Sequence, residues 1–184
     1  MIKRIQRLLS LLYLLLGQSI GFHGLYNPIR TRGFHLSAVG EQFEVEIDLP
    51  PVDSSITAAL KFDSILSVAS EVVVVRYQIP FGLDVAPRKG LAVCTKDGPG
   101  GEKVGDVLRF TTQWALELPR GDGIATVGSF AGGLSWQCSL FDVMKAKAWE
   151  QVVEALVSNT ETRTDEVVLV FERPEGGVAP ETTG

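Results

Sequence analysis

Histidine and cysteine, the side chains that most often carry nucleophilic or metal chemistry, are scarce in this sequence. The two histidines are His23 and His35, and the two cysteines are Cys94 and Cys138. If the N-terminal segment is removed, no histidine remains for a Ser-His-Asp or Cys-His nucleophile or for a His-containing zinc site. The cysteines are too far apart for a CxxC motif, so we expect two buried thiols, with a regulatory disulfide as the alternative. The sequence therefore predicts a protein that is not an enzyme and that has no metal and no cofactor.

Phosphate-binding motifs and acidic pairs do not change this prediction. The segment 98–103 has neither the spacing of a phosphate-binding loop nor a Ser or Thr after its lysine, and 121–123 lacks the third glycine of a dinucleotide fingerprint. The acidic residues do not cluster at a recognisable interval. We expect four that lie near one another in pairs to be solvated loop charges: Asp97 with Glu102, and Asp165 with Glu166.

The first 37 residues have the pattern of a targeting presequence. Basic residues at positions 3, 4 and 7 precede an apolar run over 8–16, which is far shorter than the roughly 20 residues that a bilayer-spanning helix needs. The segment 22–37 is basic and free of acids, as transit peptides are. We therefore predict a signal peptide over 1–21 and a transit segment over 22–37, with no transmembrane helix in the mature chain.

The junction between these segments resembles the bipartite plastid presequence of diatoms and related algae. In that family a phenylalanine directly follows the signal-peptidase site, and Phe22 stands here in the setting Ser19-Ile20-Gly21-Phe22. The resemblance implies a protein of the plastid (chloroplast) stroma, because no second hydrophobic segment follows. The family's usual residue before the phenylalanine is alanine rather than glycine. An ordinary secretory signal with a basic pro-segment is the alternative.

Removal of the presequence makes the protein strongly acidic. The whole chain has 17 Lys and Arg and 22 Asp and Glu, but five of the bases and none of the acids precede Ala38. The remainder therefore carries 12 bases against 22 acids, a net charge of about −10. Such a surface disfavours nucleic acid and anionic lipid as partners and suits a basic protein face. Its length of roughly 150 residues is that of one domain.

Strand patterns dominate this remainder. Alternation of apolar and acidic residues, runs of β-branched residues and intervening turn signals predict five strands, over 43–49, 71–79, 91–95, 104–111 and 166–172. The segment 80–85 is predicted to lead into a further extended piece before a turn over 86–90. A loose helical spacing predicts a short helix over 55–67. The clearest helix is predicted over 143–158, with Asp142 as its cap and an apolar face formed by Met144, Ala148, Trp149, Val152, Ala155 and Leu156.

The order of these elements resembles a PDZ domain over 72–173, preceded by the strand and short helix of 38–71 and followed by a disordered tail over 174–184. The segment 80–83 falls at that family's carboxylate-binding loop, and 104–108 matches its Gly-Asp turn. The resemblance implies an α+β fold: a PDZ-like, partly open antiparallel β-sandwich or barrel of 5–6 strands with one long and one short helix. The family's usual histidine at the start of the groove helix is missing, and the insertion over 115–138 is longer than the family's usual connection.

Two surfaces are predicted to bind other proteins. The PDZ resemblance implies a peptide site whose loop N–H groups hold a terminal carboxylate while the peptide adds a strand, formed by Phe81, Gly82, Leu83 and Val85. A plain turn between strands is the alternative. The Gly-rich stretch over 118–136 is predicted to be a long loop or loose hairpin with an exposed interface formed by Phe130, Leu134 and Trp136. A loop folded back over the sheet is the alternative there.

Together with the presequence, the acidic segment resembles the stromal accessory subunits of diatom photosystem I with its fucoxanthin-chlorophyll antenna. This resemblance implies a non-catalytic protein that is peripheral to the thylakoid membrane and docks on photosystem I core subunits or other thylakoid proteins. A PDZ-type adaptor that binds C-terminal peptides of thylakoid or stromal proteins is the alternative.

Overall fold

Antiparallel β-strands account for about half of the residues described by the computed structural model, which are 42–51, 54–117 and 135–176. Within these ranges the chain forms one α-helix, α2 (Trp149–Val157), and a single 3-10 turn, η2 (Val143–Lys145). The strands are β1 (Gln42–Asp48), β2 (Thr57–Asp63), β3 (Ser70–Gln78), β4 (Val85–Arg88), β5 (Leu91–Cys94), β6 (Val107–Glu117), β7 (Ser135–Asp142) and β8 (Glu166–Pro174).

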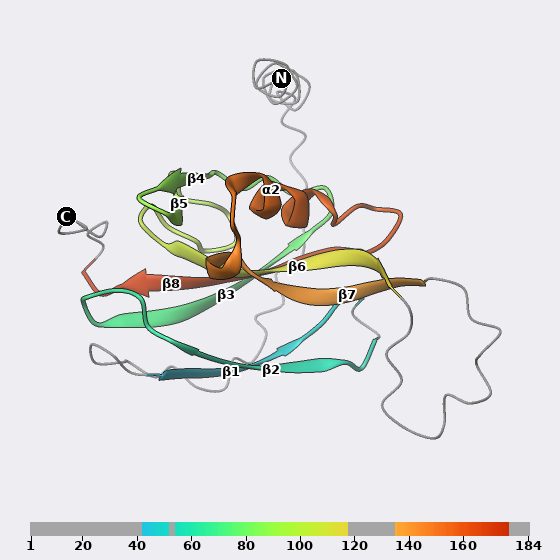
Figure 1. The fold of residues 1–184 in the computed structure, drawn as a ribbon, viewed down its shortest axis with the longest axis horizontal. Helices are drawn as coiled ribbons and strands as arrows, with labels where there is room; N and C mark the ends of the chain where they lie inside the picture. Colours follow the sequence, from blue (N-terminus) through green and yellow to red (C-terminus); the bar gives the residue numbers. More distant parts are fainter. Residues whose placement is uncertain (1–41, 52–53, 118–134, 177–184) are drawn as a thin grey trace, which may run out of the picture. The chain divides into compact units, whose positions relative to one another are not determined.

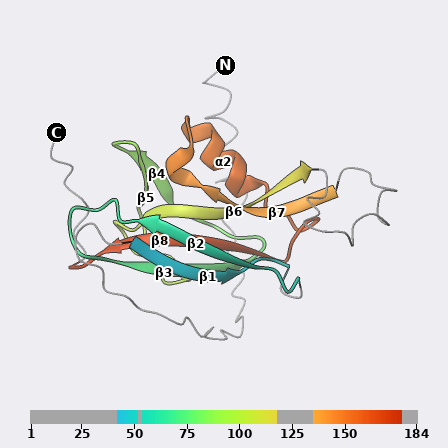
Figure 2. The same ribbon diagram turned by 60° about the horizontal axis from the view of Figure 1, so that its bottom comes forward.

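The strands form one large sheet and one separate hairpin. The large sheet has the order β3-β8-β6-β5-β4, and β7 pairs with β6. Strand β6 pairs with β8 on one side, and on its other side its first residue pairs with β5 and its later residues with β7. The hairpin β1–β2 lies on one side of the large sheet and α2 on the other (Figure 1), and the view of Figure 2 agrees with this layering.

Each face of the large sheet has its own hydrophobic cluster because successive residues of a strand point to opposite faces. On the α2 side, Leu108, Leu169 and Phe171 pack with Val152 of the helix. On the hairpin side, Val168 and Val170 pack with side chains of β1, β2 and β6: Phe43, Ile47, Phe62 and Phe110. Strand β8 is therefore buried on both faces, which explains its nearly continuous apolar sequence.

The predicted PDZ-like α+β fold is wrong. About a tenth of the described residues are helical, in α2 and η2, whereas a PDZ fold has two helices. The predicted short helix over 55–67 is instead β2, which pairs in register with β1. Its burial alternates along the strand, with Phe62 in the core and Lys61 in solvent. Pairing with β1 therefore overrides the weak helical spacing, as tertiary contacts commonly override local propensity.

The predicted helix over 143–158 is correct only in its second part. Strand β7 extends to Asp142, whose carboxylate accepts a hydrogen bond from Met144 N at 3.0 Å and so caps η2 rather than a long helix. Val143, the first residue of η2, is buried; η2 ends at its cap residue Ala146, whose backbone is extended, and α2 begins at Trp149. Met144, predicted on the apolar face, is exposed.

The hairpin β1–β2 is tied to the large sheet by a buried ion pair. Glu172 of β8 and Arg109 of β6 are 0% and 5% exposed and form a salt bridge. The guanidinium also donates to Asp63 O of β2 at 3.0 Å and lies over the Phe62 ring. The Glu172 carboxylate accepts further bonds from the segment that joins β2 to β3: Ser64 Oγ at 2.7 Å, Ile65 N at 3.1 Å, Leu66 N at 3.2 Å and Ser70 Oγ at 3.0 Å.

The C-terminal end of α2 is fastened to β6 by another buried polar group, Asn159. Its side-chain amide donates to the carbonyl oxygens of Thr112, Ala155 and Leu156 at 2.7, 3.1 and 3.1 Å. Its carbonyl oxygen accepts from Thr112 Oγ1 at 3.0 Å. Two of these acceptors are carbonyls of the last helical turn, which have no partner within the helix. Asn159 therefore ends α2 and holds it against the sheet.

Candidate functional site

One face of the β6–β7 ladder is largely apolar, although Thr112 and Asp142 also lie on it. The register is regular, with Phe110 opposite Asp142 and Leu116 opposite Trp136. Because alternate residues share a face, Trp114, Leu116, Trp136 and Cys138 continue the line of Phe110 and Leu140. Phe110 and Leu140 belong to the cluster under the hairpin. Trp114, Leu116, Trp136 and Cys138 lie beyond it, and we call these four residues the β6–β7 shelf.

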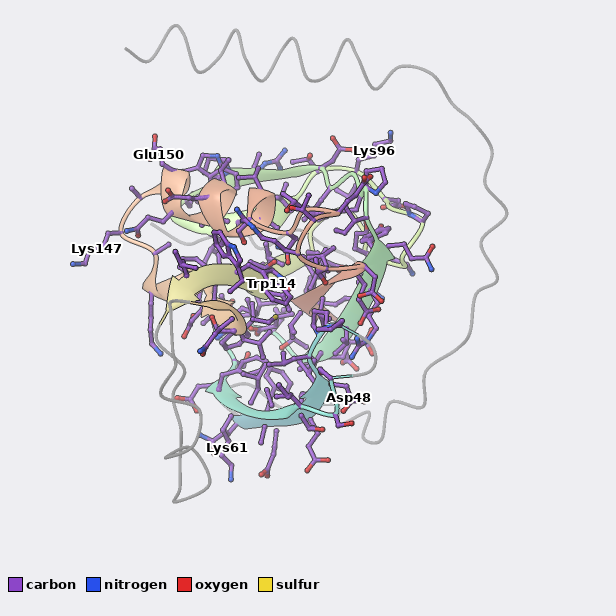
Figure 3. The ribbon with its side chains drawn as sticks, turned by 90° about the vertical axis from the view of Figure 1, so that its right-hand side faces the viewer. Asp48, Lys61, Lys96, Trp114, Lys147 and Glu150 are labelled. Atoms are coloured by element: carbon purple, nitrogen blue, oxygen red, sulfur yellow. The ribbon has the colours of Figure 1, made fainter. Side chains whose placement is uncertain are left out.

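The solvent exposure of the shelf residues increases toward the end of the ladder. Trp114 and Cys138 are half-buried, whereas Leu116 and Trp136 are 47% and 48% exposed. Figure 3 shows Trp114 between the helix, marked by Glu150, and the hairpin, marked by Asp48 and Lys61. A tryptophan and a leucine directly opposite each other on exposed strands present an apolar surface to solvent. Tryptophan is also a residue type that contributes strongly to protein interfaces.

A cation lies over the exposed tryptophan. The guanidinium carbon of Arg163 is 3.7 Å from the centroid of the Trp136 ring, in the range of a cation–π interaction. Arg163 comes from the turn between α2 and β8, where its backbone N–H donates to Thr160 O at 2.8 Å. Its Nη1 donates to Ser158 O at 3.0 Å. These contacts hold the guanidinium in place on the ring.

One of the three residues predicted to form the interface, Trp136, lies on this shelf, and Phe130 and Leu134 lie outside the described residues. The sequence interpretation missed Leu116 and Arg163. Leu116 had a signal, because Trp114 and Leu116 alternate with the same period as Trp136 and Cys138. Arg163 had none, since its place over Trp136 follows from how the turn after α2 meets β7.

The residues predicted to form a peptide site lie at the other end of the sheet, before and in β4. Phe81, Leu83 and Val85 pack against the hydrophobic cluster on the α2 side, and the Phe81 ring stacks on Tyr77 with 6.2 Å between centroids. Gly82 is exposed, and a side-chain carbon built on it meets nothing within 4 Å. Three of the four predicted residues therefore contribute apolar surface to the core.

A buried carboxylate lies near this loop, contrary to the prediction that Glu102 is solvated. Glu102 is 2% exposed, and its Oε1 accepts a hydrogen bond from the Tyr77 hydroxyl, which itself accepts from Gly100 N at 2.9 Å. Its other oxygen has no hydrogen-bond partner among the described residues. Burial, followed by the bond to Glu102, raises the pKa of Tyr77. Glu166 is half-buried and paired with Arg76, whereas Asp97 and Asp165 are exposed as predicted.

Both cysteines are free thiols. Cys94 is fully buried, as predicted, and its Sγ donates to Lys96 O at 3.0 Å. Burial raises its pKa, and nearby Glu102 adds to the effect. Cys138, on the shelf, is half-buried, and burial raises its pKa to about 12. Since the thiolate is the nucleophile, neither group is set up for thiol chemistry near neutral pH.

Within the described residues, no helix has the length and apolar composition needed to cross a bilayer. Comparison of the chain with protein-family models, with curated proteins and with solved structures returns no match.

Proposed function

We propose that this protein is a non-catalytic accessory subunit of the plastid that docks by protein–protein contacts on the stromal face of a photosystem I–antenna supercomplex. The presequence pattern supports the compartment, and the resemblance of the acidic segment, taken with that presequence, to stromal accessory subunits of diatom photosystem I supports the complex. The β6–β7 shelf is the docking face in this proposal.

The observation that carries the proposal is the exposure of Trp136. Nearly half of this side chain faces solvent, directly opposite an equally exposed leucine and beneath an arginine. Tryptophan and arginine are the residue types most enriched among those that dominate binding energy. The shelf lies on paired strands rather than on an isolated loop, so its geometry is largely preorganised for binding.

The charge of the β1–β2 hairpin supports a basic partner surface. Strand alternation turns one face of the hairpin into the core and leaves the other in solvent, where Asp48 and Lys61 project away from the sheet (Figure 3). The exposed carboxylates outnumber Lys61 and are Glu44, Glu46, Asp48 and Asp63. An acidic face steers association with a basic one and fixes orientation more than it adds affinity.

Co-migration with photosystem I tests the proposal. The full chain, tagged at its C-terminus and expressed in a diatom, should appear in the photosystem I–antenna band after mild solubilisation of thylakoids and native electrophoresis. Trp136→Ser should lower the bound fraction, since loss of a central tryptophan typically weakens an interface by 2 kcal/mol or more, about thirtyfold in Kd.

Val104→Ser is the matched control, because Val104 is apolar and 49% exposed but precedes β6, at the opposite end of that strand from the shelf, and lies outside the hairpin. It should leave the bound fraction unchanged. A chain that is found only in the soluble stroma would refute the proposed function. Equal losses in the two variants would refute the assignment of the shelf as the docking face.

A further inference from the structure

Arg163 differs from the other arginines that have polar contacts in the described part of the chain. Arg76 pairs with Glu166, Arg109 with Glu172, and Arg173 with Asp106. Arg163 forms a salt bridge with no carboxylate of the described residues. Among the described residues, its guanidinium contacts the Trp136 ring and the carbonyl oxygen of Ser158. The chain has more acids than bases, yet this arginine is held in place without a carboxylate partner among the described residues. Its positive charge is therefore available to a binding partner.

The free donors of Arg163 lie beside apolar surface. The guanidinium has five N–H donors, and Nη1 donates to Ser158 O. The other nitrogens donate to none of the described residues, and the arginine is half-exposed. Stacking on Trp136 places these donors at the margin of the shelf, next to a side chain that is 48% exposed. A guanidinium fork of this kind pairs with a carboxylate through two parallel hydrogen bonds.

We propose that the shelf receives a protein segment in which an Asp or Glu stands next to apolar side chains: the carboxylate pairs with Arg163 while the apolar groups cover Trp136 and Leu116. This inference rests on the proposed docking function and names the chemistry of the partner's contact segment. The partner surface is then basic where it faces the hairpin and carries a local acid where it meets the shelf.

Other occupants of the shelf fit less well. Binding to an anionic membrane requires several basic residues, because each contributes only about 1 kcal/mol, whereas the cation–π contact on the described shelf residues involves a single base, Arg163. A second copy of this chain would bring a net charge of −5 against an equal charge, which opposes association. A protein segment with one carboxylate can accept hydrogen bonds from the free N–H donors of Arg163. It requires neither several basic residues nor the approach of two chains of like charge.

Matched peptides test the inference directly. The probes are Ac-Leu-Asp-Leu-Phe-amide and its Asn counterpart, titrated into the 15N-labelled full chain, with the Arg163 Nε–Hε and Trp136 Nε1–Hε1 resonances as the readout. The Asp peptide should shift both resonances and bind at least about tenfold more tightly than the Asn peptide, since charge-assisted bonds are about twice as strong as neutral ones. Arg163→Gln should abolish this preference, whereas Arg88→Gln, at an exposed arginine of β4, should retain it.

The outcomes separate this inference from the docking function. Equal shifts with both peptides, or no shift with either, would refute carboxylate recognition while leaving co-migration with photosystem I as an independent result. Larger shifts with vesicles of phosphatidylglycerol than with the Asp peptide would also overturn it, in favour of a lipid surface. A preference that survives in Arg163→Lys but not in Arg163→Gln would support pairing through the cation.

Discussion

Replacement of Glu172 by glutamine should be the most destabilising near-isosteric change in the described core. Gln preserves the shape of the side chain, so its oxygen can still accept from Ser64, Ser70 and the backbone N–H groups of the linker. The atom facing Arg109 can become an NH₂ group, which cannot accept the guanidinium N–H. Arg109, 5% exposed, would then be a buried cation without a counter-charge.

The magnitude follows from the burial of the pair. Removal of one partner of a buried ion pair typically costs 3–5 kcal/mol, whereas an exposed pair contributes at most about 1 kcal/mol. Against a total stability of roughly 5–15 kcal/mol, Glu172→Gln should remove a large part of the free energy of unfolding. With a urea m-value of about 2 kcal/mol/M, the unfolding midpoint should fall by roughly 2 M.

Equilibrium urea unfolding followed by tryptophan fluorescence measures this shift. Glu44→Gln is the control, because Glu44 pairs with Lys61 in solvent at 3.3 Å, and its midpoint should stay close to that of the parent protein. The double variant Glu172→Gln/Arg109→Met should be more stable than the sum of its single effects predicts, since it removes the unpaired cation as well. A midpoint change for Glu172→Gln that equals that of Glu44→Gln would refute the reasoning.

Three further predictions concern the core and the thiols. Asn159→Ala should lower the free energy of unfolding by roughly 2–4 kcal/mol in urea titrations, because it removes the buried side-chain hydrogen bonds that join the end of α2 to Thr112 and takes away the acceptor of the Thr112 hydroxyl; an unchanged midpoint would contradict this role. Gly100→Ala should destabilise by about 1–3 kcal/mol because its methyl group would overlap β3 side chains, whereas Gly82→Ala, in open space, should be close to neutral, and equal effects would argue against the close approach. Raised pKa values keep the Cys94 and Cys138 thiols protonated at pH 8, so iodoacetamide should label the folded chain many times more slowly than the urea-unfolded chain, with mass spectrometry as the readout; equal rates would contradict the burial of these groups.

Strands with strong local patterns were predictable without the structure. The alternation over 43–49 and the β-branched runs over 71–79 and 166–172 correspond to β1, β3 and β8. In each of these segments the residue types alone indicate which faces of the strand are buried. A strand with one buried face alternates between apolar and polar residues, and a strand buried on both faces is apolar throughout. Trp136 was predicted to be exposed for another reason, its place at the end of a Gly-rich stretch, whereas in the structure it is exposed on strand β7.

The remaining elements depend on partners far away in the chain. The segment 57–63, with Ala, Leu and Lys among its residues, is a strand because β1 pairs with it and the sheet below takes its aromatic side chain. Glu102 was predicted to be a solvated loop charge, but it is buried and accepts a hydrogen bond from the Tyr77 hydroxyl, 25 residues away in sequence.

The amino-acid sequence by itself determined the acidic charge, the scarcity of histidine and the strands whose pattern is self-contained. Only the tertiary structure decided which apolar residues remain exposed and which charge remains unpaired. Arg163 and Trp136 meet through the turn after α2, and Leu116 joins them through the register of β6 and β7. The physical reason is that exposure and pairing are properties of neighbours in space, which a local pattern of residue types does not encode.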